Sequence, residues 1–188
     1  MTEITDNEVL SATQVWLEKL VIGLNLCPFA KAVYAKNKIR YIVSKVSNKK
    51  TLLAVLKEEL LLLKETPIEE VETTLLIHPY VLQDFFEYNE FLNTADELLE
   101  ELELDGDIQI ASFHPEYQFA EMDSDDIANY TNRSPFPMLH LLREESVDKA
   151  VEAFPEAEQI YEKNIDTMEH LGKEGLGQLN IPYLKINN

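Results

Sequence analysis

The chain has 188 residues, of which 45% are hydrophobic and 27% charged, a balance typical of one globular domain rather than of a disordered chain. Its 35 acidic and 16 basic residues give a formal net charge of −19, which repels phosphate backbones and anionic lipids and argues against nucleic-acid and membrane roles. One cysteine, no visible signal peptide and no bilayer-length apolar run favour a cytoplasmic protein.

The first part of the chain predicts two helices. Residues 5–8 have the spacing of a capping box, and apolar residues at helical spacing follow as far as Leu24. Proline is preferred at the first position of a helix, so Pro28 is predicted to open a short second helix over 28–36. Cys27 would then be the N-cap of this helix.

The middle of the chain alternates strands with helices. Runs rich in β-branched and apolar residues predict three strands, over 39–46, 71–77 and 107–113. Helical periodicity predicts a helix that starts near residue 48 and ends before Pro67, and another over 82–103. Strands that alternate with helices in this way are typical of crossover units in a parallel sheet.

The last part begins with a long segment, 115–137, that is polar and lacks periodicity. Its aromatic residues favour an ordered functional loop. Residues 138–144 predict a fourth strand, although leucine and methionine would also suit a helix. A new helix is predicted to start near Ser146, and the final one to cover 155–171.

These elements predict one domain over 1–188 of the α/β (or α+β) class. We expect a mixed, mainly parallel sheet of three to four strands covered by helices, with the N-terminal and C-terminal helices packed on it. The ordered core is expected to cover about residues 5–172, with Gly172 ending the last helix. Residues 173–188 would form a peripheral tail.

Two predicted strands end in the same way, because His78 and His114 each follow an apolar run and precede a proline. If the strands are parallel, both histidines emerge at the carboxyl edge of the sheet, where open α/β sheets bind ligands. Neighbouring strands lie about 4.8 Å apart, so the imidazoles could share one site. Alternatively, each His-Pro pair only ends a strand, and the imidazole bonds a loop carbonyl.

Several segments resemble the uncharacterised bacterial family known as domain of unknown function 1415. The similar segments are residues 24–30 (LNLCPFA), 73–79 (TTLLIHP), 112–115 (SFHP), 130–137 (YTNRSPFP) and 139–144 (LHLLRE). The similarity extends from about Thr13 to Gly172. It implies a stand-alone bacterial protein of about this size, and it transfers no activity and no catalytic residues.

Cys27 is a candidate nucleophile or ligand, because a thiol at a helix N-terminus has a lowered pKa. The sequence Leu-Cys-Pro-Phe-Ala is also similar to the single-cysteine motif of omega-type glutathione transferases and glutaredoxin-like proteins. In those folds a strand precedes the cysteine, whereas a helix precedes it here. The alternative interpretation is a small buried hydrophobic residue.

Arg133 and Arg143, two of only three arginines, flank a proline-rich turn and His140. The guanidinium group suits carboxylates and phosphates, so the two arginines are candidate ligands of a small anion, with Asn132 and Tyr130 adding hydrogen bonds. Alternatively, the arginines pair with the many acidic residues of the chain.

A metal or nucleotide site has little support in the sequence. One cysteine and three histidines would be a reasonable zinc or iron set, but they are scattered and lack the local spacing of known motifs: Cys27, His78, His114 and His140. No glycine-rich phosphate motif is present among five glycines. The sequence therefore identifies no metal ligands and leaves any cofactor unknown.

The leading hypothesis is a cytoplasmic enzyme or binder that acts on a small anionic metabolite at the carboxyl edge of the sheet. The arginines would hold the anion beside His78, and His114 or His140 would move protons near neutral pH. Cys27 would be the nucleophile or a ligand. The alternative is a non-catalytic acidic adaptor that docks on a basic protein through residues 115–137. The oligomeric state is not indicated.

Overall fold

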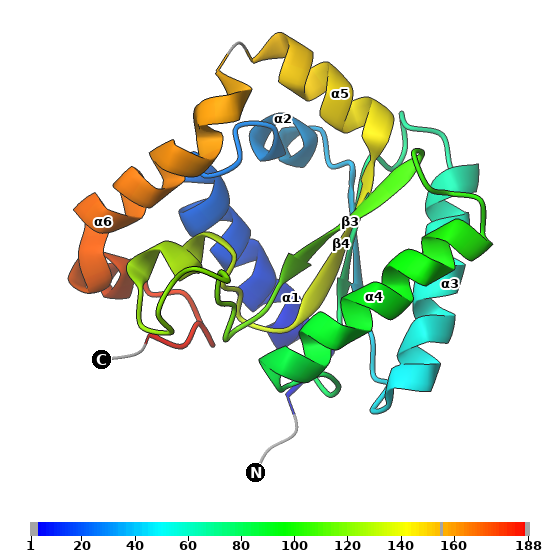
Figure 1. The fold of residues 1–188 in the computed structure, drawn as a ribbon, viewed down its shortest axis with the longest axis horizontal. Helices are drawn as coiled ribbons and strands as arrows, with labels where there is room; N and C mark the ends of the chain where they lie inside the picture. The colour runs from blue at the N-terminus through cyan, green and yellow to red at the C-terminus, as the bar shows by residue number, and fades with distance from the viewer. Residues whose placement is uncertain (1–3, 155, 187–188) are drawn as a thin grey trace.

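The computed structural model describes residues 4–154 and 156–186, and it contains one four-stranded sheet with the order β1-β2-β4-β3 (Figure 1). The strands are β1 (Ile39–Val43), β2 (Thr73–Ile77), β3 (Ile108–Phe113) and β4 (Met138–Arg143). β1 and β2 are parallel, whereas β4 is antiparallel to both of its neighbours. The prediction of a fourth strand is confirmed.

The prediction of a mainly parallel sheet is wrong, because two of the three strand pairings are antiparallel. β1, β2 and β3 do run in one direction, since helices connect them. β4 is instead reached through a long loop and inserts between β2 and β3 in the opposite direction. A loop return of this kind permits an antiparallel pairing, which helical periodicity cannot reveal.

Helices cover both faces of the sheet (Figure 1). On the face that we call the first face, α3 (Lys49–Glu65) and α4 (Phe85–Glu101) pack in one hydrophobic cluster with Leu76, Leu139 and Leu141. On the second face, α1 (Asp6–Trp16) and its π-helical continuation η1 (Leu17–Ile22) pack in another cluster. Alternate residues of each strand point to opposite faces, which explains why the strands serve both clusters.

The remaining helices lie on the side of the second face. They are α2 (Ala30–Ala35), α5 (Glu144–Ala153), α6 (Ile160–Gln178) and the short 3-10 helices η2 (Ile127–Thr131) and η3 (Ala157–Gln159). Figure 1 shows α5 and the start of α6 along the top of the view, with α2 beneath them. No helix in the described ranges is long and apolar enough to cross a membrane.

Local sequence signals account for several helix starts. Thr5 and Glu8 form the predicted capping box of α1, and the Asn48 side chain accepts a hydrogen bond from Thr51 N–H at the start of α3. The predicted Cys27 cap is wrong, because α2 begins at Ala30 after a turn, and its N-cap Phe29 makes no side-chain cap bond.

The C-terminal segment packs more closely than we expected. Gly172 (φ +62°, ψ 173°) has a non-helical backbone and ends the first helical run of α6, as predicted, and a second helical run continues after this kink to Gln178. Leu176 is only 1% exposed, and Tyr130 Oη donates a hydrogen bond to the carbonyl of Lys185. The described part of the tail therefore belongs to the second cluster, because its apolar residues bury surface that would otherwise face water.

Candidate functional site

His78 and His114 lie at the carboxyl ends of β2 and β3, and both are fully buried. The structure brings both of them close to one aromatic ring. The centroid of the Tyr88 ring is 6.0 Å from that of His78 and 5.0 Å from that of His114. The histidines are therefore neighbours across β4, but the protein interior surrounds them.

Both imidazoles bond consecutive loop carbonyls. His78 Nδ1 lies 3.0 Å from the carbonyl oxygen of Val81, and His114 Nε2 lies 3.1 Å from that of Leu82. Glu116 N–H donates to the other ring nitrogen of His114. Leu82 has a left-handed backbone (φ +59°), so these bonds hold a segment that leucine does not favour. This geometry matches the alternative in which the imidazoles bond loop carbonyls.

Burial lowers the pKa of both histidines, that of His78 to about 4. Both rings are therefore neutral at physiological pH, which fits their role as partners of backbone groups. A charged imidazolium would lack compensating water in this interior. The expected role of His114 in moving protons near neutral pH has no support in this arrangement.

Arg133 is 2% exposed, and its side chain bonds backbone carbonyls of the loop over residues 115–137. Its Nε donates to the carbonyl of Tyr117, its Nη2 donates to that of Ser124 at 2.6 Å, and its guanidinium lies 4.6 Å from the centroid of the Tyr130 ring. Asn132 Nδ2 donates to the carbonyl of Ser112. These contacts explain why the loop is ordered, and they leave the arginine turned inward.

Arg143 lies at the opposite edge of the sheet. Its Nη2 donates at 2.6 Å to the carbonyls of Leu63 and Thr66 at the C-terminus of α3, where a cation also complements the helix dipole. Arg143 pairs with Ile108 at the start of β3, five residues before Phe113. At about 3.3 Å per residue this places it roughly 17 Å from the His114 edge.

The expected anion pocket is therefore not formed by these two arginines. Each side chain bonds backbone carbonyls of its own neighbourhood, and β4 separates the two along its length. The third arginine, Arg40, makes a bidentate contact with Glu59 at 2.8 and 3.1 Å. Internal pairing was the alternative for the arginines, but the partners of Arg133 and Arg143 are carbonyls rather than acids.

Cys27 is partly buried between η1 and α2 and packs against the second cluster. Burial raises the pKa of its thiol, and the nearby backbone N–H groups of Ala30 and Phe29 only partly oppose this effect. The expected lowering of the pKa is wrong, because desolvation outweighs the amides of a six-residue helix.

The second face of the sheet can be described as three rows of side chains that cross the strands. The row closest to α1 is covered, as shown by the 5.2 Å separation of the Trp16 and Phe113 rings. The other two rows are only partly covered, and we call them the open rows. They consist of Tyr41, Leu75, His140 and Ala111, and of Ile39, Thr73, Leu142 and Gln109.

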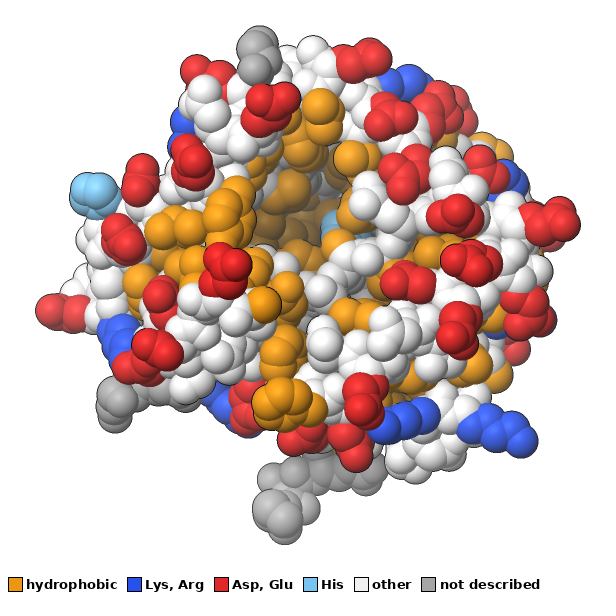
Figure 2. Space-filling view, viewed as in Figure 1, with side chains coloured by type: hydrophobic (Ala, Val, Ile, Leu, Met, Phe, Trp, Pro, Cys, Tyr) orange, Lys and Arg blue, Asp and Glu red, His pale blue; other side chains and the backbone are white. Residues whose placement is uncertain are grey.

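Figure 2 shows a hollow on this side of the molecule, lined mainly by hydrophobic side chains and with a histidine visible inside it. His140 is partly exposed, whereas His78 and His114 are fully buried and His170 is exposed on α6. Acidic side chains surround the hollow on the outer surface (Figure 2). We infer that the open rows form its floor.

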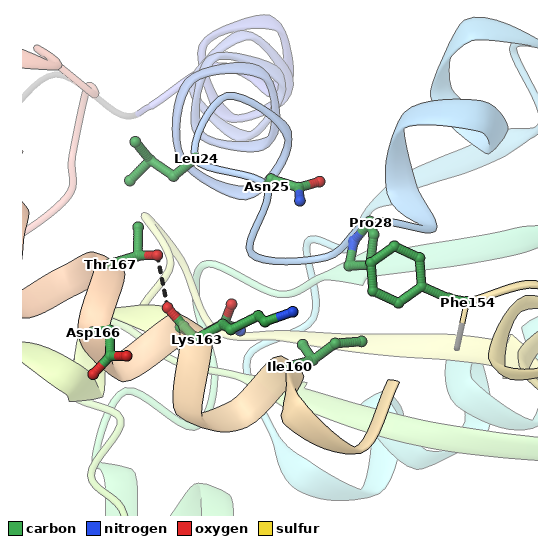
Figure 3. A pocket seen from close by; sticks show the side chains of 9 residues that line it. Leu24, Asn25, Pro28, Phe154, Ile160, Lys163, Asp166 and Thr167 are labelled. Atoms are coloured by element: carbon green, nitrogen blue, oxygen red, sulfur yellow. Dashed lines mark hydrogen bonds between the residues drawn. The ribbon is translucent and has the colours of Figure 1, made fainter. Parts of the chain in front are cut away.

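A pocket of about 320 Å³ lies on the same side, between the segment after η1 and the start of α6 (Figure 3). Pro28, Phe154 and Ile160 supply its apolar lining, and Lys163 and Asn164 supply polar groups. Asn164 Nδ2 donates to the carbonyl of Leu26 at 2.9 Å, which ties α6 to the segment before Cys27.

The hydrogen bonds around His140 favour one tautomer of its ring. Its Nε2 lies 2.7 Å from Thr73 Oγ1, and the same hydroxyl donates to the carbonyl of Leu141 at 2.6 Å. The hydroxyl has one proton, so it accepts from Nε2–H and leaves Nδ1 with a lone pair. Within the described part of the chain Nδ1 has no hydrogen-bond partner. Burial lowers the pKa of His140 to about 4.

Sequence reasoning selected His140 but missed the residues that give it a site. Thr73 and Ala111 lie beside His140 only because β4 is inserted between β2 and β3. A histidine within an apolar strand was the available signal. The pairing that supplies its hydroxyl partner was not visible, because it depends on the order of the strands.

Metal binding finds no support in this geometry. In residues 4–154 and 156–186, no group of three or more His, Cys, Asp or Glu side chains is placed to hold a metal ion. The one free nitrogen of His140 is a single donor, and structural sites for transition metals use about four.

The fold and site define a mixed α/β protein with a half-open sheet face and a neutral histidine on it. The family model described as "Protein of unknown function (DUF1415)" matches residues 8–178, so the chain belongs to this family and the resemblance is confirmed. No curated protein and no solved structure matches the chain.

Proposed function

We propose that this protein binds a small molecule in the hollow over the open rows, with His140 as the polar group that orients the ligand. The single observation that carries the proposal is the free Nδ1 lone pair of His140 on an otherwise largely apolar floor. Ligand sites commonly combine an apolar lining with a few polar groups of this kind.

Binding is better supported than proton transfer. An efficient general base has a pKa near the working pH, and burial lowers the pKa of His140 to about 4. The imidazole therefore takes up a proton reluctantly at neutral pH, and its Nδ1 lone pair stays free to accept a hydrogen bond. For this reason we propose a binding protein, cytoplasmic by the sequence argument, rather than an enzyme that uses His140 as its base.

The size of neighbouring side chains supports the same site. Ala111 is directly opposite His140 in the register, and its methyl group leaves space above the floor. Leu75, on the other side, is only 3% exposed, so the accessible apolar surface of the floor lies at Ala111 and Leu142. A ligand that covers this surface gains about 25 cal/mol per Å² of buried apolar area.

The adaptor alternative has less support. Acidic side chains are distributed over the outer surface (Figure 2) rather than gathered in residues 115–137. Some of them pair with lysines of α3, as in the contacts of Lys49 with Glu87 and of Lys57 with Glu101. Arg133 ties the 115–137 loop to the fold through the carbonyls of Tyr117 and Ser124, although acidic residues of the loop such as Asp123 and Asp125 are exposed.

A thermal-shift screen with a library of small molecules tests the proposal. The variants Ala111→Leu, which fills the floor, and His140→Leu, which removes the acceptor, are compared with the wild-type protein. His170→Leu is the matched control, because this histidine is exposed on α6. We expect compounds that raise Tm in the wild type and control but in neither floor variant. The proposal is overturned if no compound raises the Tm of the wild type and the control while leaving the Tm of both floor variants unchanged.

A further inference from the structure

We infer that Thr73 fixes His140 as a hydrogen-bond acceptor, and that the hollow therefore takes neutral or cationic molecules that present an N–H or O–H group, and not carboxylates or phosphates. This inference rests on the proposed binding function. It names the class of ligand and the positioning residue that determines it.

The hydrogen-bond chain has only one consistent direction. The carbonyl of Leu141 can only accept, so Thr73 Oγ1 uses its one proton in that 2.6 Å bond. The 2.7 Å contact with His140 then requires the proton to be on Nε2. A neutral imidazole has a single N–H, so Nδ1 is an acceptor wherever the ring meets a ligand.

An anion would meet unfavourable charges in this hollow. Its lone pairs would face the lone pair of Nδ1, and the net charge of −19 adds long-range repulsion. The three arginines are used elsewhere in the fold, and the lysine that lines the pocket, Lys163, is paired with Glu156. A neutral or cationic donor meets none of these penalties.

The first step of the test measures the tautomer without any ligand. In protein labelled with ¹⁵N-histidine, long-range ¹H–¹⁵N correlation spectra distinguish Nε2–H from Nδ1–H for His140. We expect Nε2–H in the wild type and in Thr73→Ser, which keeps the hydroxyl, and a mixture of tautomers in Thr73→Val. Pure Nε2–H in Thr73→Val overturns the positioning role.

Thr74→Val is the matched control for the loss of a threonine hydroxyl. Thr74 is the next residue of β2 and therefore points to the first face, where its buried hydroxyl has no hydrogen-bond partner within the described residues. We expect this variant to keep the wild-type tautomer. A change of tautomer in Thr74→Val as large as that in Thr73→Val would assign the effect to general loosening of the sheet and overturn the inference.

The second step compares three probes of similar shape: phenol, which donates a hydrogen bond; anisole, which only accepts; and benzoate, which is an anion. We expect phenol alone to shift the Nδ1 resonance of His140. An equal shift with benzoate or anisole, or none with phenol, overturns the ligand class. The proposed function has its own test: it fails if no compound in the thermal-shift screen loses its effect on Tm in the Ala111→Leu and His140→Leu variants.

Discussion

His114 and His140 occupy two environments that differ in how the chain uses the ring nitrogens. At the carboxyl edge, His114 has both nitrogens bonded to backbone groups, and it lies against Tyr88 in the interior. On the second face, His140 has one nitrogen bonded to Thr73, and the other is left for the hollow. The first arrangement completes a loop, whereas the second leaves a group that a ligand can contact.

This comparison shows that a perturbed pKa does not by itself identify a functional site. The pKa values of His78 and His140 are both lowered to about 4 by burial. Only His140 combines this shift with partial exposure and a small neighbour, Ala111. Access therefore distinguishes His140 from His78, because His78 Nε2 also lacks a hydrogen-bond partner within the described residues but is buried.

The largest effect of a single substitution is expected for His114→Leu. This change leaves the buried carbonyl of Leu82 and the N–H of Glu116 without partners, at a cost of about 3 kcal/mol in the free energy of unfolding. Denaturant unfolding measures the loss. His170→Leu is the control, since an exposed substitution changes stability by only about 0.5 kcal/mol. Equal losses in the two variants would contradict the structural role of His114.

The next effect concerns acid. His78 and His140 have pKa values of about 4 in the fold and about 6.5 when unfolded, so at intermediate pH the unfolded chain binds more protons. The free energy of unfolding therefore falls as pH decreases from 6.5 to 4, by up to about 3 kcal/mol per histidine.

Unfolding in denaturant at several pH values measures this dependence. His78→Gln and His140→Gln should each flatten the slope, because each removes one group that takes up a proton on unfolding. The two variants should behave alike here, although their sites differ in access. A slope equal to that of the wild type in either variant would show that its histidine is already charged, or equally solvated, in the fold.

Much of the fold could be predicted because its signals are local. The capping box at the start of α1, the run of β-branched residues in β1 and the leucine periodicity of α3 each act over a few residues. The position of β4 could not be predicted, because its apolar residues suit any interior strand. Its antiparallel insertion follows from competition among all possible pairings.

The candidate site was only partly predictable for the same reason. His78, His114 and His140 could be selected as chemically capable groups, but the sequence does not show which of their ring nitrogens bond backbone carbonyls. Arg133 and Arg143 looked available because their partners are backbone oxygens, which every residue carries and no motif marks. Thr73 became relevant only through the register of β2 with β4.

The smallest effect is expected for His140→Leu, which should cost less than about 1 kcal/mol in the free energy of unfolding. The change removes one side-chain hydrogen bond, and Thr73 keeps its bond to the carbonyl of Leu141. Thr73 is buried, but its hydroxyl keeps this one bond and is therefore not left without a partner. Denaturant unfolding of His140→Leu and His114→Leu under the same conditions compares their free energies of unfolding directly. A loss as large as that of His114→Leu would make His140 a structural group, and the distinction between the two environments would then disappear.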